Sequence, residues 1–219
     1  MWFINGKNYP KHVALVKEVV QEWEKYAKVS FTFPSDWDEE SPPEVRVYFS
    51  NNGYWSYIGR DVLEVIQGDN KPDNPKLTMN LRPDYLKEEG AEADFRGTIL
   101  HEFGHTLGFI HEHQRLDANI SYDLPKLYEY YESEFQWNIT KVDEQVFLLE
   151  EDKGQDFAVN AFDTKSIMMY AVPAQVLKAG STPIPRNNVL SDGDKEWAAR
   201  IYPKEGERRS FESKEILRF

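Results

Sequence analysis

Four of the chain's five histidines stand in one short stretch, HEFGHTLGFIHEHQR, at residues 101–115. His101 and His105 are four residues apart, so on a helix both imidazole rings project from the same face, one turn apart. Two imidazole nitrogens in this arrangement can each reach one zinc ion at about 2.0–2.1 Å. The spacing therefore predicts a metal site on a helix.

Gly108 and His111 indicate how a third ligand reaches the same ion. Zinc prefers tetrahedral angles, so the third ligand cannot come from the next turn of the same helix. Gly108, three residues after His105, can adopt a positive φ and end the helix, and His111 then approaches from another direction. Three histidines leave the fourth position open, which is typical of catalytic zinc. We expect one catalytic Zn²⁺ ion.

Glu102 supplies the group that a hydrolytic zinc site needs. It follows His101 directly and therefore points about 100° round the helix, beside the metal rather than onto it. A carboxylate there can hold the zinc-bound water and take its proton, because zinc lowers the pKa of that water to about 7. The full pattern HExxHxxGxxH matches by chance in about one such chain in a hundred thousand, which favours a real zinc site.

The two remaining histidines are interpreted as non-ligands. We expect His113 to be exposed or to support a ligand from behind, and His12 to lie on the surface of the first helix.

The composition limits the classes of partner. The chain has 219 residues, 40% of them hydrophobic, which is enough for one domain with a sizeable core. Its net charge of −12 would repel nucleic acid. It has no cysteine and no apolar run of the roughly 20 residues that a membrane helix needs. The start, MWFINGKNYPKH, does not resemble a signal peptide, so location stays open: secreted if a leader was removed, otherwise cytoplasmic.

The elements that position the histidines can be outlined from periodicity. Apolar residues at steps of three and four predict a helix at about 11–28. A second helix, with Asp94 as its N-cap, runs to Gly108 and carries the histidines, and Ser191 with Asp194 forms a capping box that opens a last short helix. Strand-like segments lie at 31–33, 45–49, 54–59 and 76–81. The loop with Asp69, Asp73 and Asn74 could bind calcium, although a solvated turn is the preferred interpretation.

The motifs resemble those of astacin-like metzincins. HEFGHTLGFIHEHQR is similar to their active-site helix and following loop, in which Glu, here Glu112, follows the third histidine. SIMMY at 166–170 resembles their Met-turn, which implies that Met168 forms an apolar floor beneath the zinc and that Tyr170 binds zinc at rest and moves to help hold the oxyanion. Similar segments in the same order extend the resemblance, shared with matrixins, to nearly the whole chain: WEKYAKVSFTF, YWSYIG, KLTMNL and LSDGDKEWAARIYP.

The resemblance implies a fold and an activity. The implied fold is α/β (α+β) and zincin-like, a single domain in which a mixed twisted sheet and the active-site helix form an upper lobe, about 1–108, separated by a cleft from a lower lobe, about 109–219. KLTMNL is similar to the edge strand that holds an extended substrate, which implies substrate-binding roles for Thr78, Met79 and Asn80. The implied protein is a monomeric zinc metalloendopeptidase acting on polypeptides, with Glu102 and Tyr170 as catalytic residues.

One alternative belongs to another functional class. The same zinc site could capture peptides without turning them over. Glu102 argues against that interpretation, because a site that only binds has no chemical need for this carboxylate.

Overall fold

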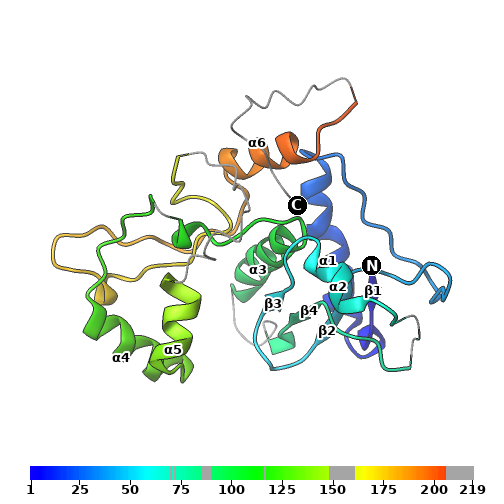
Figure 1. Cartoon of the computed structure of the whole chain (residues 1–219), viewed down its shortest axis with the longest axis horizontal. Helices are drawn as coiled ribbons and strands as arrows, with labels where there is room; N and C mark the ends of the chain where they lie inside the picture. Colours follow the sequence, from blue (N-terminus) through cyan, green and yellow to red (C-terminus); the bar gives the residue numbers. More distant parts are fainter. Residues whose placement is uncertain (70, 72, 85–89, 116, 148–160, 206–219) are drawn as a thin grey trace. The chain divides into compact units, whose positions relative to one another are not determined.

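The computed structural model describes residues 1–205 except 70, 72, 85–89, 116 and 148–160 (Figure 1). The described residues form two compact units. The first contains residues up to Phe109 together with the segment that starts at Asn188, and the second contains residues 110–187. Residues 188–205 belong to the first unit, in which Tyr202 donates its hydroxyl hydrogen to the carbonyl of Leu107 at 2.9 Å.

A small mixed sheet forms one layer of the first unit, as the sequence predicts. Its strands are β1 (Trp2–Phe3), β2 (Arg46–Phe49), β3 (Trp55–Ser56) and β4 (Met79–Leu81), in the order β1-β2-β4-β3. The β1–β2 and β2–β4 pairs are parallel, with Val47 opposite Met79, whereas β3 runs antiparallel to β4, with Trp55 opposite Asn80.

The prediction that the segment 76–81 is an edge strand is wrong. β4 lies between β2 and β3, and Thr78, Met79 and Asn80 are each at most 1% exposed. The Asn80 amide nitrogen donates to the carbonyls of Ser50 and Gly53 inside the unit. Side-chain alternation reports which face of a strand is buried, but not whether its backbone is paired on both sides. The antiparallel edge strand is β3.

The two longest helices of the first unit pack on each other, and the one that carries the histidines also contacts the sheet. The helices of this unit are α1 (Pro10–Glu24), α2 (Asp61–Ile66), α3 (Ala91–Thr106) and α6 (Asp192–Ile201), and a short 3-10 turn, η1 (Gly6–Asn8), precedes α1. Trp23 is fully buried at the end of the apolar stripe of α1, and its indole N–H donates to the carbonyl of Leu100 in α3 at 3.2 Å. The predicted capping box of Ser191 and Asp194 opens α6. This packing fixes the histidine-bearing helix α3.

Two of the local predictions about the helices are wrong. His12 is buried rather than exposed, and its Nε2 lies 2.9 Å from the carbonyl of Pro83. It stands four residues before Val16 and so shares the buried stripe of α1. α3 begins at Ala91 after Gly90, and Asp94 lies in its first turn, where a carboxylate also suits the helix dipole.

Two predictions about strands and loops turn out differently. Residues 31–33 alternate in burial but form no strand, because the described structure gives them no partner in the sheet. In the loop 67–75, Asp73 and Asn74 are exposed, as in the expected solvated turn, but the carboxylate of Asp69 is paired with the buried guanidinium of Arg46 at 2.6 Å. That pairing gives Asp69 a structural role.

The second unit is built from helices and turns around its own core. Its elements are η3 (Glu112–Gln114), α4 (Leu124–Phe135), α5 (Ile139–Val142), a π-helical turn η4 (Asp143–Phe147) and η5 (Ala174–Val176). Isolated bridges join Tyr122 to Leu177 and Val172 to Ile184. The core residues are Leu127, Val142, Val146, Met169, Val172, Val176 and Leu177. Met169 therefore packs in this core.

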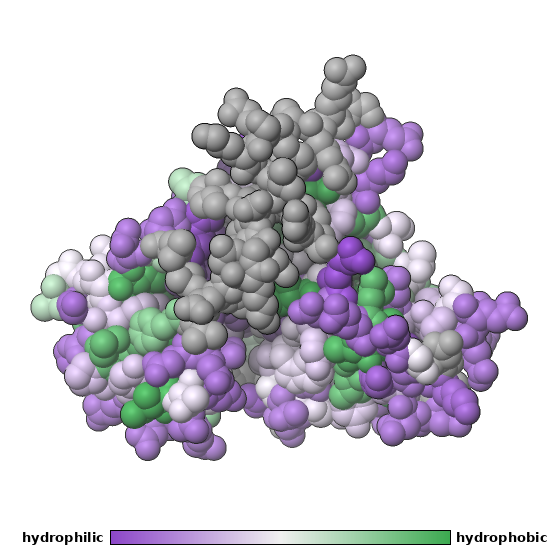
Figure 2. Space-filling model, in the orientation of Figure 1, coloured by the Kyte–Doolittle hydropathy of each residue, from purple (hydrophilic) through white to green (hydrophobic). Residues whose placement is uncertain are grey.

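The surface in Figure 2 agrees with the acidic, polar composition. Hydrophilic residues cover much of the visible face, and hydrophobic ones form separate patches among them. Within the described residues, no helix combines the length and the apolar character that a membrane span requires.

Candidate metal centre and active site

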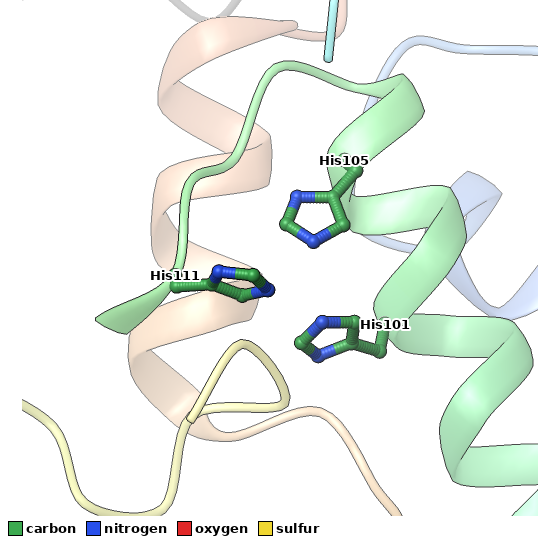
Figure 3. A group of neighbouring side chains, drawn as sticks. All are labelled: His101, His105 and His111. Atoms are coloured by element: carbon green, nitrogen blue, oxygen red, sulfur yellow. The ribbon is translucent and has the colours of Figure 1, made fainter. Parts of the chain in front are cut away.

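Three histidines converge at the C-terminal end of α3. His101 and His105 project from one face of the helix, and His111 points toward them from the segment that follows (Figure 3). One ligand atom from each ring lies within 4.8 Å of those of the other two. His105 is buried, whereas His101 and His111 are partly exposed. The sequence prediction that these residues come together is confirmed.

A tight turn at Gly108 brings His111 back toward the helix. Gly108 has φ +93°, in the left-handed region that favours glycine, and its N–H donates to the carbonyl of His105 at 2.8 Å. The N–H of Phe109 donates to the carbonyl of Gly104 at 3.0 Å, which completes the end of the helix. A Cβ atom built on Gly59 would lie 3.3 Å from the Cα of Gly108, so the loop after β3 also packs closely against this turn.

Hydrogen bonding and burial prepare His105 to bind a metal. Its Nδ1 lies 2.8 Å from the carbonyl oxygen of Phe109, which can only accept, so Nδ1 carries the proton and Nε2 keeps its lone pair. Burial lowers the pKa of His105 to about 4, so that the ring is neutral at neutral pH. A neutral imidazole with a fixed tautomer is the form that coordinates zinc.

Glu102 is a buried carboxyl group beside these ligands on α3. It is 5% exposed, and burial raises its pKa to about 8. Its Oε2 atom has no hydrogen-bond partner among the described residues. A buried polar atom of this kind is costly unless a further group meets it. Three imidazole donors and this carboxylate fit a zinc ion with a water molecule beside it.

The segment after the third histidine is tied to the Met-turn. The N–H of Glu112 donates to the carbonyl of Met168 at 3.1 Å, and one carboxylate oxygen of Glu112 accepts from the N–H of Asp163 at 2.8 Å. Within the turn, the N–H of Met168 donates to the hydroxyl oxygen of Ser166. Met168 is 2% exposed, as an apolar support would be.

Tyr170 and His113 pack around His111. The ring of Tyr170 lies 4.5 Å from that of His111 and is stacked on His113 at 4.3 Å between centroids. His113 is buried, and its Nε2 lies 2.9 Å from the carbonyl of Gln145. His113 therefore supports the site from behind, which is one of the two predicted alternatives.

Sequence reasoning missed two residues near the third ligand. The amide oxygen of Gln114 lies 3.2 Å from Nδ1 of His111, and the guanidinium of Arg115 pairs with Glu112 and Asp117. The spacing held a usable signal for Gln114, because side chains three residues apart eclipse in a 3-10 turn such as η3.

Comparison with known proteins places this geometry in context. A sequence profile of the peptidase family Astacin matches residues 87–192, a range that includes the histidine helix and the Met-turn. Zinc metalloproteinase nas-2 of Caenorhabditis elegans is 38% identical over 76 residues, which are 35% of this chain and 24% of that protein. Bone morphogenetic protein 1 of Xenopus laevis is 24% identical over 206 residues, 92% of this chain and 26% of that protein. The chain thus spans about a quarter of the length of these relatives.

Solved structures match over more of both chains. A structure of myroilysin is 31% identical, has a TM-score of 0.77, and pairs 93% of this chain with 91% of that chain. High choriolytic enzyme 1, a hatching enzyme zinc-protease from Oryzias latipes, is 16% identical with a TM-score of 0.53, covering 91% of this chain and 86% of that one, which is a likeness of fold.

Proposed function

Since this chain belongs to the astacin family of peptidases, we propose that it is a zinc endopeptidase that hydrolyses internal bonds of extended polypeptides. The observation that carries the proposal is the group of three histidines with the buried carboxyl of Glu102 beside it. His101, His105 and His111 hold one zinc ion through imidazole nitrogens. When bound, zinc supplies a Lewis acid that polarises the scissile carbonyl and makes a water molecule more acidic.

Glu102 moves the proton. Its carboxylate takes a proton from the attacking water and passes it to the leaving amine nitrogen. Burial raises the pKa of Glu102, so its carboxylate holds a proton more strongly than that of an exposed glutamate, and the charge of a bound zinc ion would keep the group ionised until the water gives up its proton. The burial that sets this basicity also excludes bulk water, which would compete for the proton.

Tyr170 and Met168 complete the site. The phenol of Tyr170, whose ring lies against His111, donates a hydrogen bond to the oxyanion of the transition state. Met168 supports the ligands from below as a buried apolar residue, and its carbonyl holds the N–H of Glu112.

The substrate binds along β3 rather than β4. β3 is the antiparallel edge of the sheet, so the backbone groups on its outer side can pair with an extended peptide. Ser56 in β3 lies 3.1 Å from Thr106 of α3 between hydroxyl oxygens, which connects this edge to the last turn of the histidine helix. The flanking Tyr54 and Tyr57 are exposed and offer aromatic surface to substrate side chains. This backbone pairing accepts many sequences, so the substrate class is extended polypeptide.

The test is hydrolysis of an unstructured protein such as casein. The purified zinc-loaded protein is expected to cleave it at internal bonds, to lose that activity with a zinc chelator, and to regain it when zinc is restored. Zinc binding without cleavage would contradict the proposal and favour the peptide-capture alternative. We propose that the monomer is the active form, and the molar mass in solution, from light scattering on the same preparation, checks this.

A further inference from the structure

The side chain of Gln114 connects the third histidine to the second unit's backbone. Its amide oxygen lies 3.2 Å from Nδ1 of His111. Its amide nitrogen donates to the carbonyl of Glu144 at 3.2 Å and to the carbonyl of Gln145 at 3.2 Å. Both carbonyls belong to the π-helical turn η4. Every polar atom of the Gln114 side chain is therefore engaged.

The two carbonyls determine the orientation of the Gln114 amide. A backbone carbonyl can only accept, so the NH₂ group of Gln114 must face Glu144 and Gln145. Its oxygen then faces His111, and because an amide oxygen can only accept, Nδ1 of His111 must carry a proton. The lone pair of His111 is left on Nε2.

Local backbone geometry keeps Gln114 in place. η3 is a 3-10 turn, and the N–H of Gln114 donates to the carbonyl of His111 at 3.3 Å. In such a turn the side chains of residues i and i+3 lie on the same side. His113, between them in sequence, donates its own Nε2–H to the carbonyl of Gln145 at 2.9 Å. The carbonyl of Gln145 thus accepts hydrogen bonds from the side chains of both His113 and Gln114.

We propose that Gln114 is a positioning residue that fixes the tautomer and ring orientation of His111 for metal binding. The inference rests on the proposed function, in which His111 is a zinc ligand. Gln114 accepts a hydrogen bond from Nδ1 of His111, as the carbonyl of Phe109 does from Nδ1 of His105. The difference is that the partner of His105 is backbone, whereas the partner of His111 is a side chain that substitution can remove.

The first experiment measures zinc affinity with a competing chelator. Gln114→Met removes the acceptor and both donors at similar length, and zinc affinity is expected to fall about 10- to 100-fold, as for other partners of ligating histidines. Gln114→Glu keeps an acceptor for Nδ1, so its affinity is expected to lie closer to that of the wild type. Gln175→Met, an exposed glutamine of the second unit, is the matched control and leaves affinity unchanged.

The second experiment reads the tautomer directly in the zinc-free protein. Two-bond ¹H–¹⁵N spectra of the histidine rings are expected to show His111 protonated at Nδ1 in the wild type, and to show that preference weakened in Gln114→Met. Wild-type zinc affinity in Gln114→Met, or a wild-type His111 protonated at Nε2, overturns the role of Gln114 and leaves the proposed hydrolysis standing. If His111→Ala binds zinc as tightly as the wild type, the ligand assignment itself fails.

Discussion

At the residue scale, His111 is the ligand whose position depends on a turn of the backbone. His101 and His105 are placed by one helix, but His111 reaches them only because Gly108 adopts φ +93°. Its ring is further held by Tyr170 and by the loop that Glu112 ties to Met168. These contacts hold the ring of His111 in place before a metal ion binds.

His111→Ala is therefore expected to weaken zinc retention as severely as His105→Ala. Each substitution removes one of three protein ligands, and two imidazoles cannot define a tetrahedral site with one open position. Zinc content after dialysis against a competing chelator at neutral pH measures the effect. Full occupancy in the His111 variant would rule out this residue as the third ligand.

Tyr170→Phe tests the proposal that the phenol of Tyr170 donates a hydrogen bond to the oxyanion. The substitution keeps the ring, and with it the stacking on His113, but removes the hydroxyl donor. Losing one oxyanion donor costs on the order of 10²-fold in kcat, about 3 kcal/mol. We expect that loss with zinc content and KM nearly unchanged. Normal turnover in the Phe variant would mean that the chain works on zinc and Glu102 alone.

At the scale of elements, the loop after His111 is connected to the Met-turn segment through Glu112. Its carboxylate accepts from the N–H of Asp163, and Nε of Arg115 lies 3.4 Å from the same oxygen. Arg115 also donates from Nε and Nη2 to the two carboxylate oxygens of Asp117 at 2.9 and 3.0 Å. The Arg115 and Glu112 side chains are only 11% and 13% exposed, so water screens their pairing weakly.

Arg115→Met is expected to destabilise this connection. Removing the guanidinium leaves two carboxylates without their cation, which costs about 1–3 kcal/mol in the free energy of unfolding. Chemical denaturation of the zinc-loaded protein measures it. Arg200→Met, which removes an exposed pair with Glu196 on α6, is the control and is expected to change stability by less than about 1 kcal/mol. Equal effects of the two substitutions would mean that Arg115 contributes no more to stability than an exposed ion pair does.

The elements also show which parts of the fold could be predicted from the sequence. The histidine helix and its end at Gly108 could be predicted, because the spacings that indicate them lie within eleven residues of the sequence. The neighbours of β4 depend on pairing with β2 and β3, which stand well before it in the chain. Alternation alone cannot reveal them, so the sequence does not show that β3, and not β4, is the antiparallel edge strand.

Side chains that support the site were harder to predict than the ligands. The role of Gln114 depends on the carbonyls of Glu144 and Gln145, which are 30 and 31 residues away in sequence. The three-residue spacing can indicate the contact of Gln114 with His111, but no spacing indicates the two distant carbonyls that orient its amide. His12 was misplaced for the opposite reason: its step to Val16 was visible, but a polar residue was assumed to face water.

At the scale of the whole molecule, zinc binding and folding are linked. The ion binds a group of ligands that only the folded chain brings together, so it stabilises the native state by mass action. At free zinc about a thousand times its Kd, the stabilisation is about 4 kcal/mol. Denaturant unfolding with and without zinc is expected to differ by that amount, and the difference should disappear in His105→Ala. Coincident curves for the wild type would contradict a zinc site formed by folding.

The most direct test of the central claim is Glu102→Gln. The amide keeps the shape of the side chain but cannot take a proton, so zinc content is expected to equal that of the wild type while hydrolysis of casein falls by at least about 10²-fold, since a general base contributes 10²–10⁴-fold. Both quantities are measured on the same preparation. Wild-type zinc content with activity within about tenfold of wild type would contradict the assignment of Glu102 as the base.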